Sequence, residues 1–196
     1  MKKGILVLIG LALVLSGCSN RVSYGDAQEI ETTTIDFGSS DLQKIASEMV
    51  DSMLMSGAVG AITYNKRPVV FVERIKNKTA EHIDTESITD SISTKMLNSG
   101  KFRFVDMNRV ESVRKQLNFQ NNDQLVNSNN VIQFGKMVGA EYMLYGNLSS
   151  IVKKAGSDKD VYYKMTMRLM DLETGIIEWA DETEIRKQES KSLLGF

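Results

Sequence analysis

Cysteine, histidine, proline and tryptophan each occur only once in this chain of 196 residues. A single cysteine excludes an internal disulfide framework, so the fold must be held together by burial of apolar side chains. One histidine without a second cysteine argues against a zinc site and against a Cys–His catalytic pair. The formal charge is −1, with 24 basic and 25 acidic side chains, and this balance does not predict a nucleic-acid partner. We therefore expect no metal, no cofactor and no catalytic residue.

The one cysteine, Cys18, follows Leu15-Ser16-Gly17 at the end of an apolar run. Lys2 and Lys3 precede this run, which is too short to span a bilayer as a mature helix. The pattern resembles the lipobox of bacterial lipoproteins, in which the cysteine is acylated and the signal peptide is cut just before it. An ordinary secretory signal with a chance cysteine is the alternative. The sequence thus predicts a signal peptide over 1–17 and lipidation of Cys18.

The segment from Ser19 to Ser39 is polar and has no clear period, which is typical of a tether. Fully extended it would reach about 70 Å, and as a flexible coil about 25 Å on average. An aspartate directly after the cysteine would resemble an inner-membrane retention signal, but the residue at that position is Ser19. We expect a lipidated N-terminus and tether over 18–39, one domain over 40–196, and an anchor on the periplasmic side of the outer membrane.

Apolar periodicity predicts four helices and five strands within that domain. Ser40 is the expected N-cap of the first helix, and Asp84 or Thr85 that of the second. We expect loops over 58–67 and 118–130, a polar turn over 153–160 and a tight turn at Leu172–Gly175. The fold class is α/β of the α+β kind, a mixed, mostly antiparallel sheet of four to five strands flanked by helices. The expected helices are 40–57, 85–98, 107–117 and 131–138, and the expected strands are 69–72, 102–105, 141–152, 161–169 and 176–186.

Aromatic side chains are the best candidates for a binding role. Tyr142 and Tyr145 are three residues apart on one predicted strand, so they point to opposite faces, and Tyr162 lies on the polar side of its strand. Tyrosine is favoured at protein interfaces. His82, in a polar stretch before a helix, is expected to be a solvated loop residue. A hydrolase using paired carboxylates such as Glu182 and Glu184 is an alternative that the sequence alone leaves open.

Four segments of the chain are informative when taken together and in order: Asn98–Phe102, Lys115–Phe119 with Asp123–Leu125, Gly139–Tyr145 and Thr174–Trp179. The fourth is shared widely, with domains of the curli-secretion and TolB N-terminal type. As an ordered set they resemble the LpoB family of outer-membrane lipoproteins that activate a bifunctional class A penicillin-binding protein.

The resemblance implies a non-catalytic protein that docks on a small regulatory domain of the synthase and stimulates peptidoglycan synthesis. It also implies a docking surface on the globular domain. Our hypothesis places this surface at Tyr145, Gln116, Asn118, Phe119, Gln120 and Gln124. Enteric members carry a long proline-rich tether, whereas the only proline here, Pro68, lies inside the domain. A structural or accessory lipoprotein of an envelope machine, either secretory or flagellar, is the alternative on the same fold.

Overall fold

The computed structural model describes residues 25–27, 29–30, 34–116 and 128–190. Within these ranges no helix combines the length and the apolar character needed to cross a membrane. The helices are α2 (Ser39–Met55), α3 (Gly57–Ile62), α4 (Thr85–Asn98), α5 (Met107–Gln116) and α6 (Ser128–Val138). The strands are β1 (Val69–Val72), β2 (Lys76–Lys78), β3 (Arg103–Phe104), β4 (Tyr142–Ala155), β5 (Asp158–Asp171) and β6 (Ile177–Glu189).

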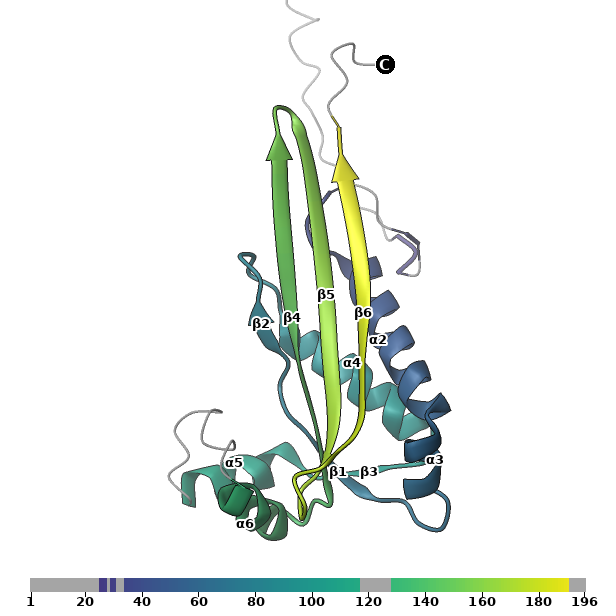
Figure 1. Ribbon diagram of the computed structural model, residues 1–196, viewed down its shortest axis with the longest axis vertical. Helices are drawn as coiled ribbons and strands as arrows, with labels where there is room; N and C mark the ends of the chain where they lie inside the picture. Colours follow the sequence, from purple (N-terminus) through teal and green to yellow (C-terminus); the bar gives the residue numbers. More distant parts are fainter. Residues whose placement is uncertain (1–24, 28, 31–33, 117–127, 191–196) are drawn as a thin grey trace, which may run out of the picture.

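The six strands form one mixed sheet in the order β3-β1-β4-β5-β6, with β2 also paired to β4. The three long strands β4, β5 and β6 are antiparallel and make up most of the sheet. The short strands β1 and β2 run parallel to β4 and pair one after the other along its free edge. Beyond β2, the last residues of β4 pair only with β5, while β6 stays paired with β5 as far as Lys159, so the three long strands extend past the short ones (Figure 1).

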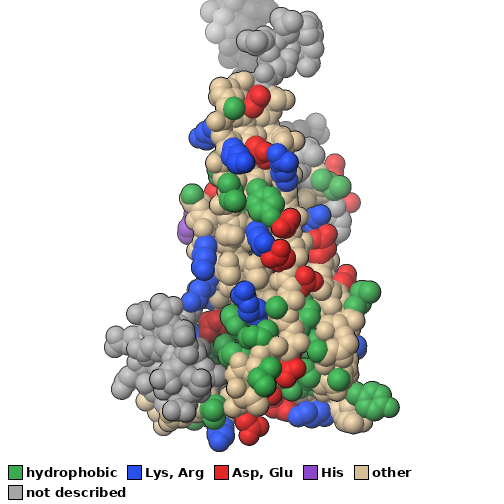
Figure 2. Space-filling view, in the orientation of Figure 1, with side chains coloured by type: hydrophobic (Ala, Val, Ile, Leu, Met, Phe, Trp, Pro, Cys, Tyr) green, Lys and Arg blue, Asp and Glu red, His purple; other side chains and the backbone are tan. Residues whose placement is uncertain are grey.

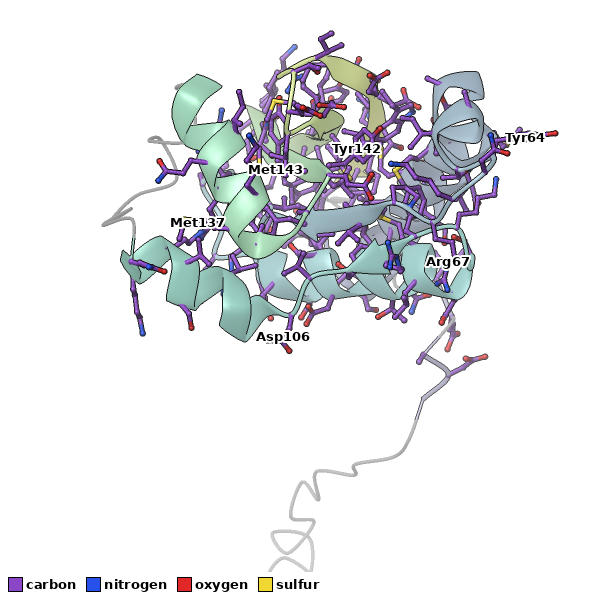
Figure 3. The ribbon with its side chains drawn as sticks, turned by 90° about the horizontal axis from the view of Figure 1, so that it is seen from below. Tyr64, Arg67, Asp106, Met137, Tyr142 and Met143 are labelled. Atoms are coloured by element: carbon purple, nitrogen blue, oxygen red, sulfur yellow. The ribbon has the colours of Figure 1, made fainter. Side chains whose placement is uncertain are left out.

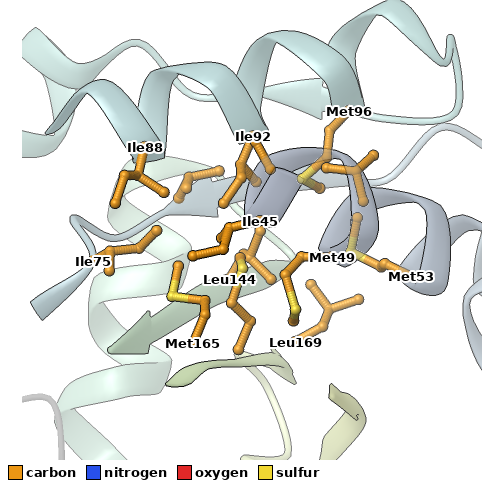
Figure 4. Packing of buried hydrophobic residues seen from close by; sticks show 14 of the residues in the cluster. Ile45, Met49, Met53, Ile75, Ile88, Ile92, Met96, Leu144, Met165 and Leu169 are labelled. Atoms are coloured by element: carbon orange, nitrogen blue, oxygen red, sulfur yellow. The ribbon is translucent and has the colours of Figure 1, made fainter. Parts of the chain in front are cut away.

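The main core lies between one face of this sheet, which we name the inner face, and the helices α2 and α4 (Figure 4). Strand alternation supplies one side of it, because every second residue of β5 from Val161 to Leu169 is buried. The helices supply the other side with Ile45, Met49 and Met53 of α2 and with Ile88, Ile92 and Met96 of α4. The methionine-rich stripe of the first helix is therefore core.

A second, smaller cluster packs α5 and α6 against the opposite face at the lower end of the sheet (Figure 1). Phe71 of β1 contacts Phe134 of α6 edge to face, with ring centroids 5.2 Å apart. The Arg114 guanidinium of α5 lies 5.6 Å from the Phe71 centroid and is hydrogen-bonded to the buried carboxylate of Glu73. Burial raises the pKa of Glu73, and the charge of Arg114 opposes that rise. This ion pair fixes the C-terminal half of α5 to the sheet.

The sequence predicted the helix ends well where a capping side chain or a glycine sets them. Asp84 caps α4 by accepting hydrogen bonds from the backbone N–H groups of Glu86 and Ser87. Gly100 and Gly139 follow α4 and α6 with positive φ values of 70° and 76°. The predicted turn before β6 is also present, with Gly175 at φ 75°.

Several boundaries differ from the prediction. The N-cap of α2 is Gly38 rather than Ser40, because the Asp41 carboxylate accepts a hydrogen bond from the Gly38 N–H at 2.8 Å. The predicted loop 58–67 contains α3, and the predicted polar turn 153–160 is mostly strand. The sheet has six strands where five were predicted, and the additional strand is β2, which is short and polar. α6 begins at Ser128, and the rest of the predicted loop 118–130 lies outside the described residues.

Gly146 of β4 provides a test of the packing between neighbouring strands. A Cβ at this position would overlap the carbonyl oxygen of Thr166 and lie 2.9 Å from Met167 Cγ. We expect Gly146→Ala to lower the free energy of unfolding by about 1–3 kcal/mol, measured by urea denaturation. Gly60→Ala is the control, since its Cβ meets nothing within 4 Å and alanine favours a helix. Equal stability of the two variants would contradict the packing described here.

The Glu73–Arg114 pair predicts a pH-dependent loss of stability. Arg114→Met leaves a buried carboxylate without its partner, so the free energy of unfolding near pH 8 should fall by about 3 kcal/mol. Without Arg114 the pKa of Glu73 rises further above its ordinary value of 4.5, and the folded state takes up the proton first. Stability therefore recovers as the pH falls, and the loss should be smaller near pH 5.

Lys44→Met is the control for this experiment, because it removes only the exposed pair with Glu48. Its effect should stay within about 0.5 kcal/mol at both pH values. A loss for Arg114→Met that is equal at the two pH values would show that Glu73 does not titrate as described.

Candidate functional site

The face of the β4–β6 strands opposite the main core is open above α5 and α6, and we name it the outer face. It is built by strand alternation, since the residues between the buried positions of each strand point this way. All of its side chains are partly or fully exposed. Cross-strand pairing arranges them in five rows: Tyr145–Arg168–Ala180, Asn147–Thr166–Glu182, Ser149–Lys164–Glu184, Ile151–Tyr162–Arg186 and Lys153–Asp160–Gln188.

Five charged side chains on this face, Lys164, Glu182, Glu184, Arg186 and Asp160, are paired with one another across the strands. Lys164 Nζ lies 2.6 Å from Glu182 and 3.8 Å from Glu184, and the hydrogen bond to Glu182 raises the pKa of Lys164. Arg186 donates to Asp160 through Nε and Nη2, at 2.5 Å for the shorter bond, which lowers the pKa of Asp160. Exposed pairs of this kind add little stability, but they hold the side chains in a defined pattern.

An apolar patch lies among these charges, in an open hollow of the outer face. Ile151 is 58% exposed, and Tyr162 is its direct cross-strand neighbour. The Tyr162 hydroxyl is hydrogen-bonded to Glu184, which raises the pKa of Tyr162. Arg186 and Lys153 complete the rim of the hollow. Figure 2 shows this side of the molecule as a mosaic of paired charges around apolar groups. Tyrosine and arginine are among the side chains that most often contribute binding energy at protein interfaces.

The predicted docking residues are only partly described by the structure. Tyr145 is half-buried at the lower end of the outer face, where it packs against the same cluster as α5 and α6. Gln116 is exposed at the C-terminal end of α5. Tyr145 and helix α5 therefore pack against the same hydrophobic cluster. The other predicted docking residues, Asn118, Phe119, Gln120 and Gln124, lie outside the described residues.

The remaining candidates from the sequence take clear positions. Tyr142 packs against the main core and Tyr145 against the second cluster, so the prediction that they face opposite ways is confirmed. In Figure 3 Tyr142 lies near the centre of the lower end. His82 is exposed, as predicted. Glu182 and Glu184 share Lys164 as their ion-pair partner on an open surface. Within the described ranges, no three His, Cys, Asp or Glu side chains are grouped closely enough to hold a metal ion.

Ile151 and Arg186 are members of the candidate surface that sequence reasoning did not single out. A signal for Ile151 was present, because Ile151 and Val152 are adjacent apolar residues on one strand and therefore point to opposite faces. The hairpin extends past the helices there, so neither residue is covered. For Arg186 we find no such signal, since its position in the hollow depends on the register of β6 with β5.

Comparison with known proteins identifies relatives along nearly the whole chain. Residues 41–185 match the model of the LpoB family, described as peptidoglycan-synthase activators. The penicillin-binding protein activator LpoB of Dickeya dadantii is 22% identical over 210 residues, covering 96% of this chain and 100% of that protein. LpoB of Escherichia coli K12 is 25% identical over 135 residues, covering 69% of this chain and 60% of the relative.

The fold agrees with solved structures of the same family. The C-terminal domain of Escherichia coli LpoB superposes with a TM-score of 0.57 and 24% identity, covering 74% of this chain and 98% of that domain. The corresponding domain from Salmonella enterica gives a TM-score of 0.56 at 22% identity. The family match begins within α2 and ends within β6, and it includes most of the strands that carry the outer face. This chain is therefore a member of the LpoB family of peptidoglycan-synthase activators.

Proposed function

We propose that this chain is an outer-membrane lipoprotein that binds and activates a bifunctional class A penicillin-binding protein through its outer face. Membership of the LpoB family is the observation that carries the proposal. An activator of this kind needs no chemistry of its own, because a partner that binds the active conformation more tightly shifts the population toward it. The chain would catalyse no reaction itself.

The outer face suits this task because the inner face is already occupied by the main core. Ile151 and Tyr162 provide an apolar centre, and Arg186 provides a planar cation beside it. A docking partner would bury this centre while the surrounding charge pairs set orientation and exclude mismatched surfaces. Among the described residues, this hollow is the place on the sheet where exposed aromatic, aliphatic and charged side chains come together.

The size of the outer face indicates that docking extends beyond it. Three strands about 4.8 Å apart and five rows about 7 Å apart cover roughly 500 Å². A standard interface buries about 800 Å² on each partner. The missing area lies next to Tyr145, where the second cluster brings in α5 and its terminal Gln116. The predicted docking residues Asn118, Phe119, Gln120 and Gln124 follow directly in the chain, and we include them in the proposed surface.

Anchoring is the second part of the proposal. Cys18 would be acylated after removal of residues 1–17, and Ser19 would direct the lipoprotein to the outer membrane. Two or more acyl chains on one residue give a practically permanent anchor, because each CH₂ buried in lipid contributes about 0.8 kcal/mol.

Binding measurements on tyrosine variants test the docking surface. We expect Tyr162→Ala and Tyr145→Ala each to weaken binding to the purified synthase by at least about tenfold, since buried tyrosines are frequent hot spots. Tyr64→Ala is the matched control. Tyr64 is 84% exposed and points away from the molecule on the side opposite Met137 (Figure 3). Unchanged affinity for both outer-face variants would exclude this surface, and Phe119→Ala would then test the neighbouring segment by itself.

Metabolic labelling tests the anchor. Cells fed labelled palmitate should yield a labelled protein that fractionates with the outer membrane. Cys18→Ser should abolish both the label and the membrane fractionation, because no second thiol is present to accept the lipid. An unlabelled mature protein with an intact Cys18 would contradict the lipoprotein assignment.

A further inference from the structure

The edge of β4 that faces away from β5 is covered by short strands along only part of its length. β1 pairs with β4 at Tyr142–Leu144, and β2 pairs with it at Asn147–Ser149. From Ser150 to Ala155 the structure describes no strand beside β4 other than β5, and Figure 1 shows this side of β4 open above β2. We name residues 150–155 the free β4 edge.

The backbone of the free β4 edge directs hydrogen-bonding groups outward. The Glu73 N–H donates to the Leu144 carbonyl at 2.8 Å, so Leu144 directs its polar backbone groups toward the short strands. These directions alternate along a strand, and the β4–β5 register is uninterrupted. The even-numbered residues Ser150, Val152 and Lys154 therefore point the same way, beyond the end of β2. Their N–H and C=O groups are available to a further strand.

The side chains at the free β4 edge include two exposed aliphatic groups. Ile151 is 58% exposed and Val152 is 42% exposed. They point to opposite faces of the sheet, because successive side chains of a strand alternate. A strand added at this edge would thus have an apolar neighbour on each of its faces.

The charge at the free β4 edge is positive, and carboxylates of the domain leave much of it unbalanced. Lys154 lies directly opposite Lys159 of β5, and the Asp36 carboxylate binds Lys159 at 3.0 Å. Lys78, the last residue of β2, is exposed at the lower end of the edge. Within the part of the chain that the structure describes, neither Lys78 nor Lys154 has an ion-pair partner. Opposite charges on neighbouring strands stabilise their pairing, so this edge favours an acidic strand.

The same lysines disfavour a second copy of this chain as the occupant. Pairing of two free β4 edges would bring Lys153 and Lys154 of one copy next to those of the other, and like charges on neighbouring strands are destabilising. Lysine at an edge strand is a recognised protection against pairing between identical chains. An acidic partner segment meets no such repulsion.

We propose that the synthase adds one extended, acidic segment to the free β4 edge, as a strand that continues the line of β2. The inference rests on the proposed function and extends the outer face, since the added strand would lie beside Ile151 of the hollow. Main-chain hydrogen bonds to Ser150, Val152 and Lys154 would supply affinity, while the neighbouring side chains would select the partner sequence.

A proline at position 152 tests the backbone pairing. Val152→Pro removes the N–H that points to the free β4 edge, and proline is tolerated on an edge strand when its nitrogen faces solvent. We expect this variant of the full-length protein, solubilised in detergent, to bind the purified synthase at least about tenfold more weakly. The reason is that proline removes a donor and its ring occupies the space of the added strand. Biolayer interferometry measures the affinity, and urea denaturation shows whether the variant is folded.

Two further variants isolate the effect of the missing N–H. Val152→Thr keeps the N–H and the branched shape, and it should bind at least about ten times more tightly than Val152→Pro. Gly57→Pro is the control for proline itself. Gly57 is the exposed first residue of α3, where proline is tolerated, and Ser56 before it already has the extended backbone that proline requires. Gly57→Pro should bind like the unchanged chain.

Charge reversal tests the acidic character of the partner segment. Lys78→Glu with Lys154→Glu should weaken binding by at least about fivefold, because it places like charges beside the added strand. Lys44→Glu with Lys95→Glu alters the net charge equally on the exposed sides of α2 and α4, and it is the matched control. Hydrogen exchange of the unchanged chain needs no substitution. In the complex, the N–H groups of Val152 and Lys154 should exchange at least about tenfold more slowly.

Each outcome supports or overturns the proposal. Unchanged binding by Val152→Pro, together with weakened binding by Tyr162→Ala, would overturn the added strand and leave the docking surface intact. A dimer of the unchanged chain that Val152→Pro dissociates would identify a second copy as the occupant and overturn it too. Unchanged exchange at Val152 and Lys154 in a complex that does form would also contradict it. Failure of the unchanged chain to bind the synthase would refute the proposed function, and the added strand with it.

Discussion

The three long strands β4 to β6 have two faces in different environments: helices α2 and α4 cover the inner face over most of its length, whereas the outer face is largely exposed. On the inner face Tyr163, Met165 and Leu169 are buried by α2 and α4, which fixes the register of the strands. Once that register is set, Tyr162, Lys164 and Arg186 must point outward. The composition of the proposed docking surface is thus a consequence of burying the other face.

The two hydrophobic clusters stabilise different parts of the fold. The larger one packs strands β4 to β6 against α2 and α4. The smaller one holds α5 and α6 at the lower end of the sheet through Phe71, Phe134 and the Glu73–Arg114 pair. Tyr145 packs on the smaller cluster at the border of the outer face. The proposed docking surface therefore joins a rigid sheet to helices positioned by one buried ion pair, and a mutation at Arg114 would act on it without touching a partner.

Elements set by local chemistry were predictable from the sequence. The alternation in β5, the Asp84 cap and the positive-φ glycines at positions 100, 139 and 175 all act within a few residues. β2 was missed because its three polar residues owe their strand conformation only to pairing with β4.

Of the candidate site, alternation correctly placed Tyr142 and Tyr145 on opposite faces and Tyr162 on the exposed side. The meeting of Ile151, Tyr162 and Arg186 depends on two strand registers that no local pattern reveals. Asp36 and Phe37 contact Lys159 and Glu81, which lie more than forty positions away in the chain, and composition suggested only a polar tether.

Photocrosslinking in living cells tests the central claim most directly. A photoreactive amino acid placed at Ile151 should be crosslinked to a class A penicillin-binding protein, and the same amino acid at the exposed Tyr64 should not. Capture of ring or secretion subunits in place of the synthase at position 151 would contradict the account and favour a structural role for this chain.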